Sequence, residues 1–227
     1  MFIAVVNLTD LSGESTCAVN LACELAGPSA IETDRWGGKR SVVFVDATTN
    51  RKAAYHCSQR RLPVSCEHVP LQYPADIDHW IRRVAAIEVD YVVIEGPSRG
   101  DVYVEAILSM SDLMVIPCSV DDRDLAAANS IVRLIGKARS TRMGRWPRCL
   151  LVPTCVDGRI DTETDIKTTL EQFGEPVTPP IHQRIEFADA FVAGRWIGEY
   201  APNSFAHLEI KVLAARVEDC IGRLDCV

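Results

Sequence analysis

Phe2-Ile3-Ala4-Val5-Val6-Asn7 opens the chain as an apolar run, and residues 8–16 follow it as a polar loop that contains one glycine, Gly13. The apolar pattern resumes over residues 17–22, so this stretch predicts a strand, a loop and a helix. In a phosphate loop of this form, backbone N–H groups and a helix N-terminus converge on an anion, and a lysine supplies the countercharge. Glu14 stands at that lysine position. The sequence therefore predicts the strand–loop–helix backbone of a phosphate site without the lysine that neutralises the phosphate.

Four more apolar runs of strand length follow, and each is nearly continuous rather than alternating: residues 41–45, 91–94, 113–116 and 149–152. Such runs indicate strands that are buried on both faces of a parallel sheet. Helical patterns occupy residues 15–25, 75–87, 102–109, 122–137, 161–173 and 203–221. The alternation predicts an α/β fold with a doubly wound, mostly parallel sheet flanked by helices. Because no linker interrupts it, we expect residues 1–227 to form a single domain.

The composition, with 48% hydrophobic and 24% charged residues, is that of a soluble globular protein. The net charge of −7 argues against a surface that binds nucleic acid all over. No apolar stretch approaches the roughly 18 residues that span a bilayer, and Met1 leads directly into the first strand, so we expect a cytoplasmic protein. The nine cysteines are scattered without C-x-x-C spacing, which favours reduced, mostly buried thiols over a metal site.

Hydroxyl and acidic side chains gather where the first strands of the predicted sheet end. Ser15 and Thr16 follow the first strand, and Asp46 and Glu95 follow two others. Ligands of a doubly wound sheet bind at the carboxyl ends of its strands, so these side chains lie where a magnesium–phosphate site would be. Structural interpretations stay open, because Ser15 and Thr16 can cap the helix and Asp46 and Glu95 can be turn residues.

The succession of these motifs resembles the deviant-Walker P-loop ATPases of the ParA/MinD type, which position plasmids, chromosomes and other cargo. The matching segments cover nearly the whole chain in family order: residues 3–22 for the phosphate loop, 41–47 for the first switch, 91–97 for the Walker B strand and second switch, 112–117 for the next strand, and 181–202 for the C-terminal segment. The resemblance implies a fold like that of the P-loop NTPases.

In that family, ATP is held between the subunits of a dimer, which binds DNA non-specifically and responds to a partner protein. The resemblance therefore implies ATP and Mg²⁺ as cofactors, a homodimer, and a partner of the ParB-like or cargo-adaptor type. It places nucleotide binding at Gly13, Glu14, Ser15, Thr16, Asp46 and Glu95, with the magnesium ion at Ser15 and Asp46. Residues 216–227 mix both charges, so we expect no membrane-binding helix at the end of the chain.

The chain departs from the family at the residues that carry the chemistry. The replaced positions are the first lysine (Thr9), two glycines (Asp10 and Leu11), the second lysine (Glu14), an aspartate of the first switch (Thr48) and the Walker B aspartate (Glu95). At about 4 Å and an effective dielectric constant of about 20, one unit charge contributes about 4 kcal/mol. Glutamate in place of lysine thus turns an attraction for the triphosphate into a repulsion of similar size. The helix N-terminus stabilises the phosphate by only about 0.3–1 kcal/mol, which does not offset that repulsion. Because phosphoryl transfer depends on positioning and charge, we expect weak or absent ATP hydrolysis and assign no catalytic residue.

Two interpretations of the function follow. The first is a ParA-like plasmid or chromosome partition or cargo-positioning protein with an impaired nucleotide site. The alternative is a nucleotide-independent pseudo-ATPase, a binding or regulatory module that acts through protein–protein contacts. Synthetases of the same fold need the loop lysine, and the iron–sulfur relatives carry cysteines that residues 96–117 lack. ATP binding remains possible if Mg²⁺ screens the charge of Glu14, or if another cation takes the place of the lysine. The candidate cations are Lys39, Arg51 and Arg99.

Two groups of basic residues are candidates for contact with DNA. The first lies in or near the C-terminal segment, among at least as many acidic residues: Arg184, Arg195, Lys211, Arg216 and Arg223. The second is the densest run of the chain: Arg133, Lys137, Arg139, Arg142, Arg145 and Arg148. A solvated helix end, with cations near the helix C-terminus, is the simpler explanation of this second run.

Overall fold

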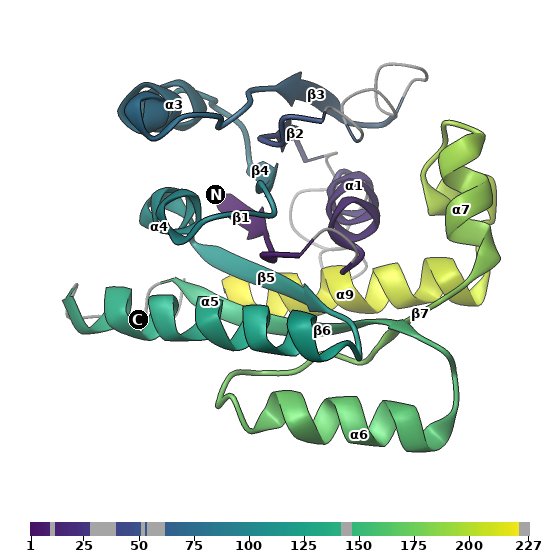
Figure 1. The fold of residues 1–227 in the computed structure, drawn as a ribbon. Helices are drawn as coiled ribbons and strands as arrows, with labels where there is room; N and C mark the ends of the chain where they lie inside the picture. The colour runs from purple at the N-terminus through teal and green to yellow at the C-terminus, as the bar shows by residue number, and fades with distance from the viewer. Residues whose placement is uncertain (10–11, 28–39, 51–52, 54–61, 142–146, 223–227) are drawn as a thin grey trace.

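The structure is a computed structural model, and it describes residues 1–9, 12–27, 40–50, 53, 62–141 and 147–222. Seven residues that the sequence singled out lie outside these ranges: Asp10, Leu11, Lys39, Arg51, Arg142, Arg145 and Arg223. Figure 1 shows the described residues as a central sheet with helices on both of its faces.

The described strands form one parallel sheet in the order β3-β2-β4-β1-β5-β6-β7. The chain places β2, β3 and β4 on one side of β1, and β5, β6 and β7 on the other. The bounds are β1 (Phe2–Val5), β2 (Val42–Asp46), β3 (Ser65–His68), β4 (Tyr91–Glu95), β5 (Leu113–Cys118), β6 (Arg148–Val156) and β7 (Ile181–His182). This arrangement confirms the predicted doubly wound α/β fold. The strand order reverses at β1, and ligands of such sheets bind at the carboxyl end of that point.

Helices cover both faces of the sheet (Figure 1). Residues of α1, α7, α8 and α9 join the core on one face, and residues of α3, α4, α5 and α6 join the core on the other. The bounds are α1 (Glu14–Leu25), α3 (Ile77–Ala85), α4 (Asp101–Met110), α5 (Asp122–Thr141), α6 (Ile160–Glu171), α7 (Ile185–Val192), α8 (Ile197–Tyr200) and α9 (Phe205–Gly222), with a 3₁₀ turn over Pro74–Asp76 before α3. No helix of the described ranges is both long and apolar enough to cross a membrane.

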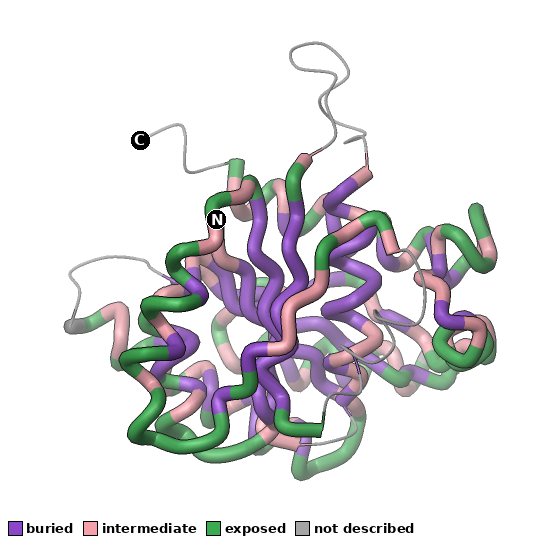
Figure 2. Tube along the Cα trace, turned by 90° about the horizontal axis from the view of Figure 1, so that it is seen from above, coloured by how far each residue is buried: buried purple, intermediate pink, exposed green. Residues whose placement is uncertain are grey.

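The residues of β1 explain why this segment is the central strand. Successive side chains of a strand point to opposite faces of the sheet. Ile3 and Val5 accordingly pack into the core beneath α1 and α9, whereas Ala4 and Val6 pack into the core beneath α3, α4 and α5. Figure 2 shows such buried residues running through the middle of the molecule. A strand that is buried on both faces needs apolar residues at every position, which accounts for the continuous runs in the sequence.

The predicted strands and helices are present, although their ends differ from the predicted ranges. The elements that the sequence analysis did not predict as strands or helices are β3, β7, α7 and α8. Within the described residues, the structure holds no disulfide, and its cysteines are free thiols, four of them buried: Cys17, Cys23, Cys118 and Cys149. The burial of these four agrees with the expectation that the cysteines are mostly buried.

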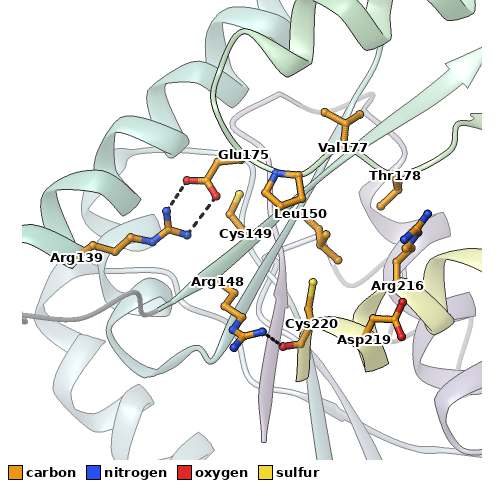
Figure 3. A pocket seen from close by; sticks show the side chains of 11 residues that line it. Arg139, Arg148, Cys149, Leu150, Glu175, Val177, Thr178, Arg216, Asp219 and Cys220 are labelled. Carbon is orange, nitrogen blue, oxygen red and sulfur yellow. Dashed lines mark hydrogen bonds and ion pairs between the residues drawn. The ribbon is translucent and has the colours of Figure 1, made fainter. Parts of the chain in front are cut away.

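Arginine side chains tie α5 and α9 to the amino end of β6 (Figure 3). Arg139 of α5 forms an ion pair with Glu175, which includes a 3.2 Å hydrogen bond from Nη2. Arg148 begins β6 and donates a hydrogen bond to the backbone carbonyl of Cys220, near the end of α9. Together with Arg216 they line a pocket of about 570 Å³. Because Arg139 and Arg148 hold parts of the fold together, this end of the basic run has a structural role.

Candidate phosphate-loop site

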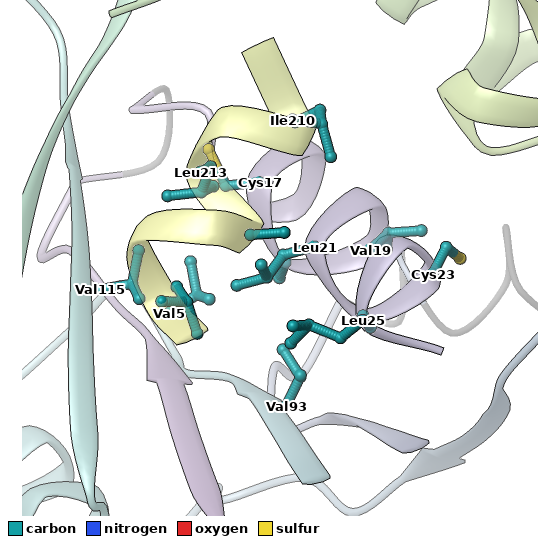
Figure 4. Packing of buried hydrophobic residues seen from close by; sticks show 14 of the residues in the cluster. Val5, Cys17, Val19, Leu21, Cys23, Leu25, Val93, Val115, Ile210 and Leu213 are labelled. Atoms are coloured by element: carbon teal, nitrogen blue, oxygen red, sulfur yellow. The ribbon is translucent and has the colours of Figure 1, made fainter. Parts of the chain in front are cut away.

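α1 is held against the centre of the sheet by its buried face (Figure 4). Leu21 lies in one apolar cluster with Val5 of β1 and Leu213 of α9. A polar contact adds to this packing, because the side-chain carbonyl of Asn20 accepts a 2.7 Å hydrogen bond from the backbone N–H of Ile197, the first residue of α8. The N-terminus of α1 is therefore fixed at the carboxyl end of β1, where the sequence predicts the phosphate loop.

Gly13 makes the turn from the loop into α1. Its φ of 83° and ψ of 16° are left-handed, a conformation that glycine adopts without steric cost. Its carbonyl accepts the first hydrogen bond of the helix, 2.9 Å from the N–H of Cys17. Gly13 is the N-cap residue, and no side chain caps the helix. The interpretation of Ser15 and Thr16 as N-caps is therefore wrong, because both lie inside the first turn.

The Glu14 carboxylate lies within the loop instead of pointing into solvent. The residue is only 7% exposed. One carboxylate oxygen accepts a hydrogen bond from the backbone N–H of Asn7, directly after β1, and the other accepts a 2.9 Å hydrogen bond from the hydroxyl of Ser98, in the loop after β4. The partial positive charge at the N-terminus of α1 favours an anion at this position. The Glu14 side chain therefore joins the segment after β1 to the loop after β4.

Ser15 and Glu95 meet at the carboxyl end of β4. The Ser15 hydroxyl donates a hydrogen bond to a carboxylate oxygen of Glu95, which is 4% exposed. Asp46 ends β2 and is paired in register with Glu95 of the neighbouring strand. The structure therefore brings together Ser15, Asp46 and Glu95, the side chains that the sequence places at a magnesium site. Thr16, like Ser15, lines a pocket beside α7.

Asp46 is the last residue of β2, and its carboxylate bonds to the loop that follows the strand. One of its carboxylate oxygens accepts hydrogen bonds from the backbone N–H of Thr48 at 2.9 Å and from the Thr48 hydroxyl at 2.6 Å. The backbone carbonyl of Thr48 lies 2.9 Å from Nε2 of His68, at the end of β3. Among the described residues there is no group of three His, Cys, Asp or Glu side chains that could hold a metal ion. These contacts tie the Asp46 carboxylate to the loop that follows β2.

Thr9 occupies the position of the first family lysine, and its hydroxyl donates a hydrogen bond to Asp124. Asp124 lies in the first turn of α5 and is 5% exposed. The same carboxylate accepts a 3.2 Å hydrogen bond from the backbone N–H of Ser119. The start of the loop is therefore bound to the segment after β5.

Arg99 lies away from the loop. Its Nη2 donates a 3.2 Å hydrogen bond to the backbone carbonyl of Gln72, and its guanidinium lies 5.3 Å from the centre of the Tyr103 ring. These contacts hold it on the surface beside α4. Of the cations that the sequence offered as substitutes for the lysine, Arg99 is the one within the described ranges, and it does not point to Glu14.

The cations of the C-terminal segment are largely paired with acidic residues. Arg184 donates hydrogen bonds of 2.9 and 2.7 Å to the Glu209 carboxylate, which raise the pKa of its guanidinium. Arg195 lies 3.4 Å from Glu199 one helical turn away. Lys211 and Arg216, the other two candidates for DNA contact, are exposed on α9. The four candidates for DNA contact therefore do not form a uniformly basic face.

His182 was not predicted as a site residue. Its Nδ1 lies 2.7 Å from the Glu209 carboxylate, and its Nε2 lies 2.8 Å from the Glu163 carboxylate of α6. Burial lowers the pKa of His182, but the hydrogen bonds to these two carboxylates outweigh it, and the net result is a raised pKa. The sequence carries no signal for this cluster, because its three members come from α6, β7 and α9.

No family model matches the sequence, and the search of curated proteins gives no match. Solved structures do match. The putative plasmid partition protein of Borrelia burgdorferi B31 bound to AMPPNP has a TM-score of 0.65 and 14% identity over 92% of this chain and 97% of its own. Apo McdA of Cyanothece has a TM-score of 0.72 and 11% identity over 97% of this chain and 98% of its own.

The MinC:MinD cell division protein complex of Aquifex aeolicus gives a TM-score of 0.72 and 14% identity over 96% of each chain. Identities this low show a shared fold and leave the chemistry of the site to be argued from its residues. The parallel sheet flanked by helices, and the loop between β1 and α1, are the features that the sequence predicts for such a fold. The chain therefore has the α/β fold of the ParA, MinD and McdA ATPases.

Proposed function

We propose that this protein is a ParA-like partition or cargo-positioning protein that works without ATP hydrolysis. One observation carries the proposal: the Glu14 carboxylate is bound inside the phosphate loop, between the Asn7 N–H and the Ser98 hydroxyl. A phosphate that enters the loop has to displace this carboxylate from its donors or share them with it. At about 4 Å and an effective dielectric constant of about 20, each unit of like charge opposes binding by about 4 kcal/mol.

The other site residues support the same conclusion. A magnesium ion on the triphosphate needs oxygen ligands that are free to turn toward it. The Ser15 hydroxyl instead donates to Glu95, and Asp46 accepts two hydrogen bonds from Thr48. Ser15 and Asp46 are therefore both engaged within the protein in this arrangement, and a magnesium–triphosphate group would have to share or displace these hydrogen bonds.

The alternative function is a binding or regulatory module that acts through protein contacts. Exposed apolar residues near the C-terminal segment favour it: Ile185 is 69% exposed, Val192 87% and Phe205 72%. Large apolar side chains on a surface mark sites of interaction with other proteins. Either function includes a second copy of the chain or a partner of the ParB-like or cargo-adaptor type. The Aquifex MinD structure, solved as a complex with MinC, is a precedent for such a partner on this fold.

Calorimetry with magnesium and ATP tests the loss of nucleotide binding. We expect no heat from the unmodified protein up to millimolar ATP. Glu14→Gln removes the charge and keeps the shape, and Glu14→Ala also removes the side chain from the loop. We expect each to bind ATP at least about tenfold more tightly than the unmodified protein, since tenfold requires only about 1.4 kcal/mol.

Glu88→Ala is the matched control, because Glu88 is an exposed carboxylate that precedes β4, at the far end of that strand from the loops. We expect it to leave ATP binding absent. Micromolar ATP binding by the unmodified protein would contradict the proposal. If neither Glu14 variant gains affinity, the carboxylate is not the group that excludes the phosphate.

DNA binding separates the two functions. A partition protein of this fold is expected to bind DNA, with an affinity that falls steeply as salt neutralises its phosphate contacts. A module that acts through proteins alone gives no salt-dependent binding. A filter-binding titration at several salt concentrations decides between them. Arg216→Glu is the informative variant, and Arg195→Glu, at a residue already paired with Glu199, is its control.

A further inference from the structure

The pocket shown in Figure 3, which we name the β6 pocket, lies between α5, the start of β6 (residues 148–150), residues 175–178 and the end of α9. Its volume of about 570 Å³ is within the range of about 300–1,000 Å³ that is usual for pockets that bind small molecules. The phosphate loop follows the carboxyl end of β1, whereas the β6 pocket lies at the amino end of a strand of the same parallel sheet. A ligand bound here would leave the phosphate loop untouched, so its binding is independent of the function proposed above.

Uncharged side chains form one wall of the β6 pocket. Cys149 and Leu150 of β6 are buried, and Pro176 and Val177 lie beside them. The segment that carries Pro176 and Val177 is bound to β6, because the Pro176 carbonyl accepts a 2.9 Å hydrogen bond from the backbone N–H of Leu151. Burial raises the pKa of the Cys149 thiol well above its ordinary value, so the thiol is uncharged near neutral pH. This wall therefore favours the apolar part of a ligand.

Charged side chains surround this wall. On one side, Arg139 and Glu175 neutralise each other in the ion pair described above. On the other side, α9 contributes Arg216 and Asp219, which are both exposed (Figure 3). Neither of these two side chains forms a hydrogen bond or an ion pair with any residue that the structure describes. The Arg216 guanidinium, with its five N–H donors, is therefore available to a ligand in the pocket.

We propose that the β6 pocket binds a small organic acid, that is, a compound with an apolar body and a single carboxylate. A guanidinium matches a carboxylate in geometry, because two of its parallel N–H groups can donate to the two oxygens. Arg216 is the group that binds the carboxylate, and the apolar body lies against the wall of Leu150, Pro176 and Val177.

The charges of the lining decide the sign and the size of the ligand's charge. The lining carries three arginines and two carboxylates, and this balance favours an anion over a cation. Asp219 lies three residues after Arg216 on the same helix and so repels any second negative charge close to the first. A compound with one carboxylate therefore fits the β6 pocket better than a dianion or a polyanion such as nucleic acid.

Two fluorescent dyes with one ring system test this inference. Anilinonaphthalene sulfonate carries a sulfonate, which stands in for the carboxylate, and N-phenylnaphthylamine is the same ring system without the charge. We expect the anionic dye to bind saturably and at least about tenfold more tightly than the neutral dye. Octanoate, which has an apolar chain and one carboxylate, should displace the bound anionic dye. Inorganic phosphate at the same concentration should not, because it lacks the apolar body.

Three variants assign the binding to the β6 pocket. Arg216→Gln removes the guanidinium and should weaken binding of the anionic dye at least about fivefold. Asp219→Asn removes the repelling charge and should tighten it about two- to threefold. A gain in affinity is a result that a misfolded variant would not give. Arg83→Gln is the matched control and should change nothing, because Arg83 is an exposed arginine on α3 and lies outside the pocket.

Each result has a defined meaning when the circular dichroism and thermal midpoint of the variants match those of the unmodified protein. Equal binding of the anionic dye by Arg216→Gln and Arg83→Gln would overturn the assignment to Arg216. Equal affinity of the unmodified protein for the two dyes would overturn the charge of the ligand, and displacement by inorganic phosphate would overturn its apolar body. If Arg216→Gln does not fold, Asp219→Asn still decides, because unchanged or weaker dye binding by that variant would overturn the proposal.

Discussion

Replacement of Glu14 by alanine should destabilise the protein. If Glu14 were only a misplaced charge, its removal would relieve repulsion, because Glu95 lies close by through its hydrogen bond with Ser15. The structure instead gives the Glu14 carboxylate two donors and a helix N-terminus. A loss of stability on replacement would therefore show that the Glu14 carboxylate stabilises the loop, and a gain would show that it is a misplaced charge.

The size of the effect follows from the groups that lose their partner. The Asn7 N–H is buried, and a buried donor that loses its acceptor costs about 1–3 kcal/mol. The loss of an acidic residue at a partly buried helix start adds about 0.3–2 kcal/mol. We expect Glu14→Ala to lower the free energy of unfolding by about 2–4 kcal/mol. Glu14→Gln keeps an acceptor for the N–H and should cost about 1 kcal/mol.

Urea unfolding followed by circular dichroism measures this change. With a slope of about 2–3 kcal/mol per molar urea, Glu14→Ala should shift the midpoint down by about 1 M. Glu88→Ala, at an exposed residue far from the loop, serves as the control and should leave the free energy of unfolding within about 0.5 kcal/mol of the starting value.

A midpoint for Glu14→Ala that equals or exceeds that of the unmodified protein would refute the reasoning. It would show that the carboxylate contributes no net stability in the loop, and that its two hydrogen bonds do not repay the desolvation of its charge. A change in the slope without a change in midpoint would point to an altered unfolded state instead.

Three further predictions concern other contacts. His182 has a raised pKa in the folded state, so its contribution to stability is complete below about pH 6.5 and is lost as the pH rises through the raised value. His182→Gln should flatten this decline in the free energy of unfolding, measured by unfolding curves at several pH values. An unchanged decline would contradict the prediction. Asn20→Ala removes the acceptor of the buried Ile197 N–H and should cost about 1–3 kcal/mol, and a midpoint equal to the parent in urea unfolding would count against it. The Ser12 hydroxyl is buried without a hydrogen bond among the described residues, so Ser12→Ala should keep or raise the thermal midpoint, and a clear loss would reveal a partner.

The apolar runs predicted the central strands because these strands are buried on both faces. β3 and β7 were not predicted because they lack such a continuous apolar run. β3 reads Ser65-Cys66-Glu67-His68, is exposed or half-buried throughout, and pairs with β2 alone among the described strands. β7 contains only Ile181 and His182. An edge strand is held by backbone hydrogen bonds to one neighbour, and these leave little trace in side-chain polarity.

The position of the phosphate loop could be predicted from the sequence, but the role of Glu14 could not. Gly13 marks the turn because its conformation requires glycine, and that requirement is local. The partner of Glu14 is Ser98, which lies 84 residues away along the chain, and the partner of Ser15 is Glu95, 80 residues away. Contacts at such separations depend on which strands become neighbours, so the charge of Glu14 indicated repulsion of a ligand and not a bond within the protein.

The hydrogen bond between Glu14 and Ser98 has a consequence for regulation. When two loops are joined by a dissociable ligand, the fraction of molecules in the joined state follows the concentration of that ligand. Here the joining group is covalently part of α1, so its effective concentration at the loop is fixed by the chain and is unchanged by dilution. Under the function proposed above, the contact between these two loops forms as the protein folds, and any timing that the protein imposes in the cell comes from its synthesis, its degradation or its partners.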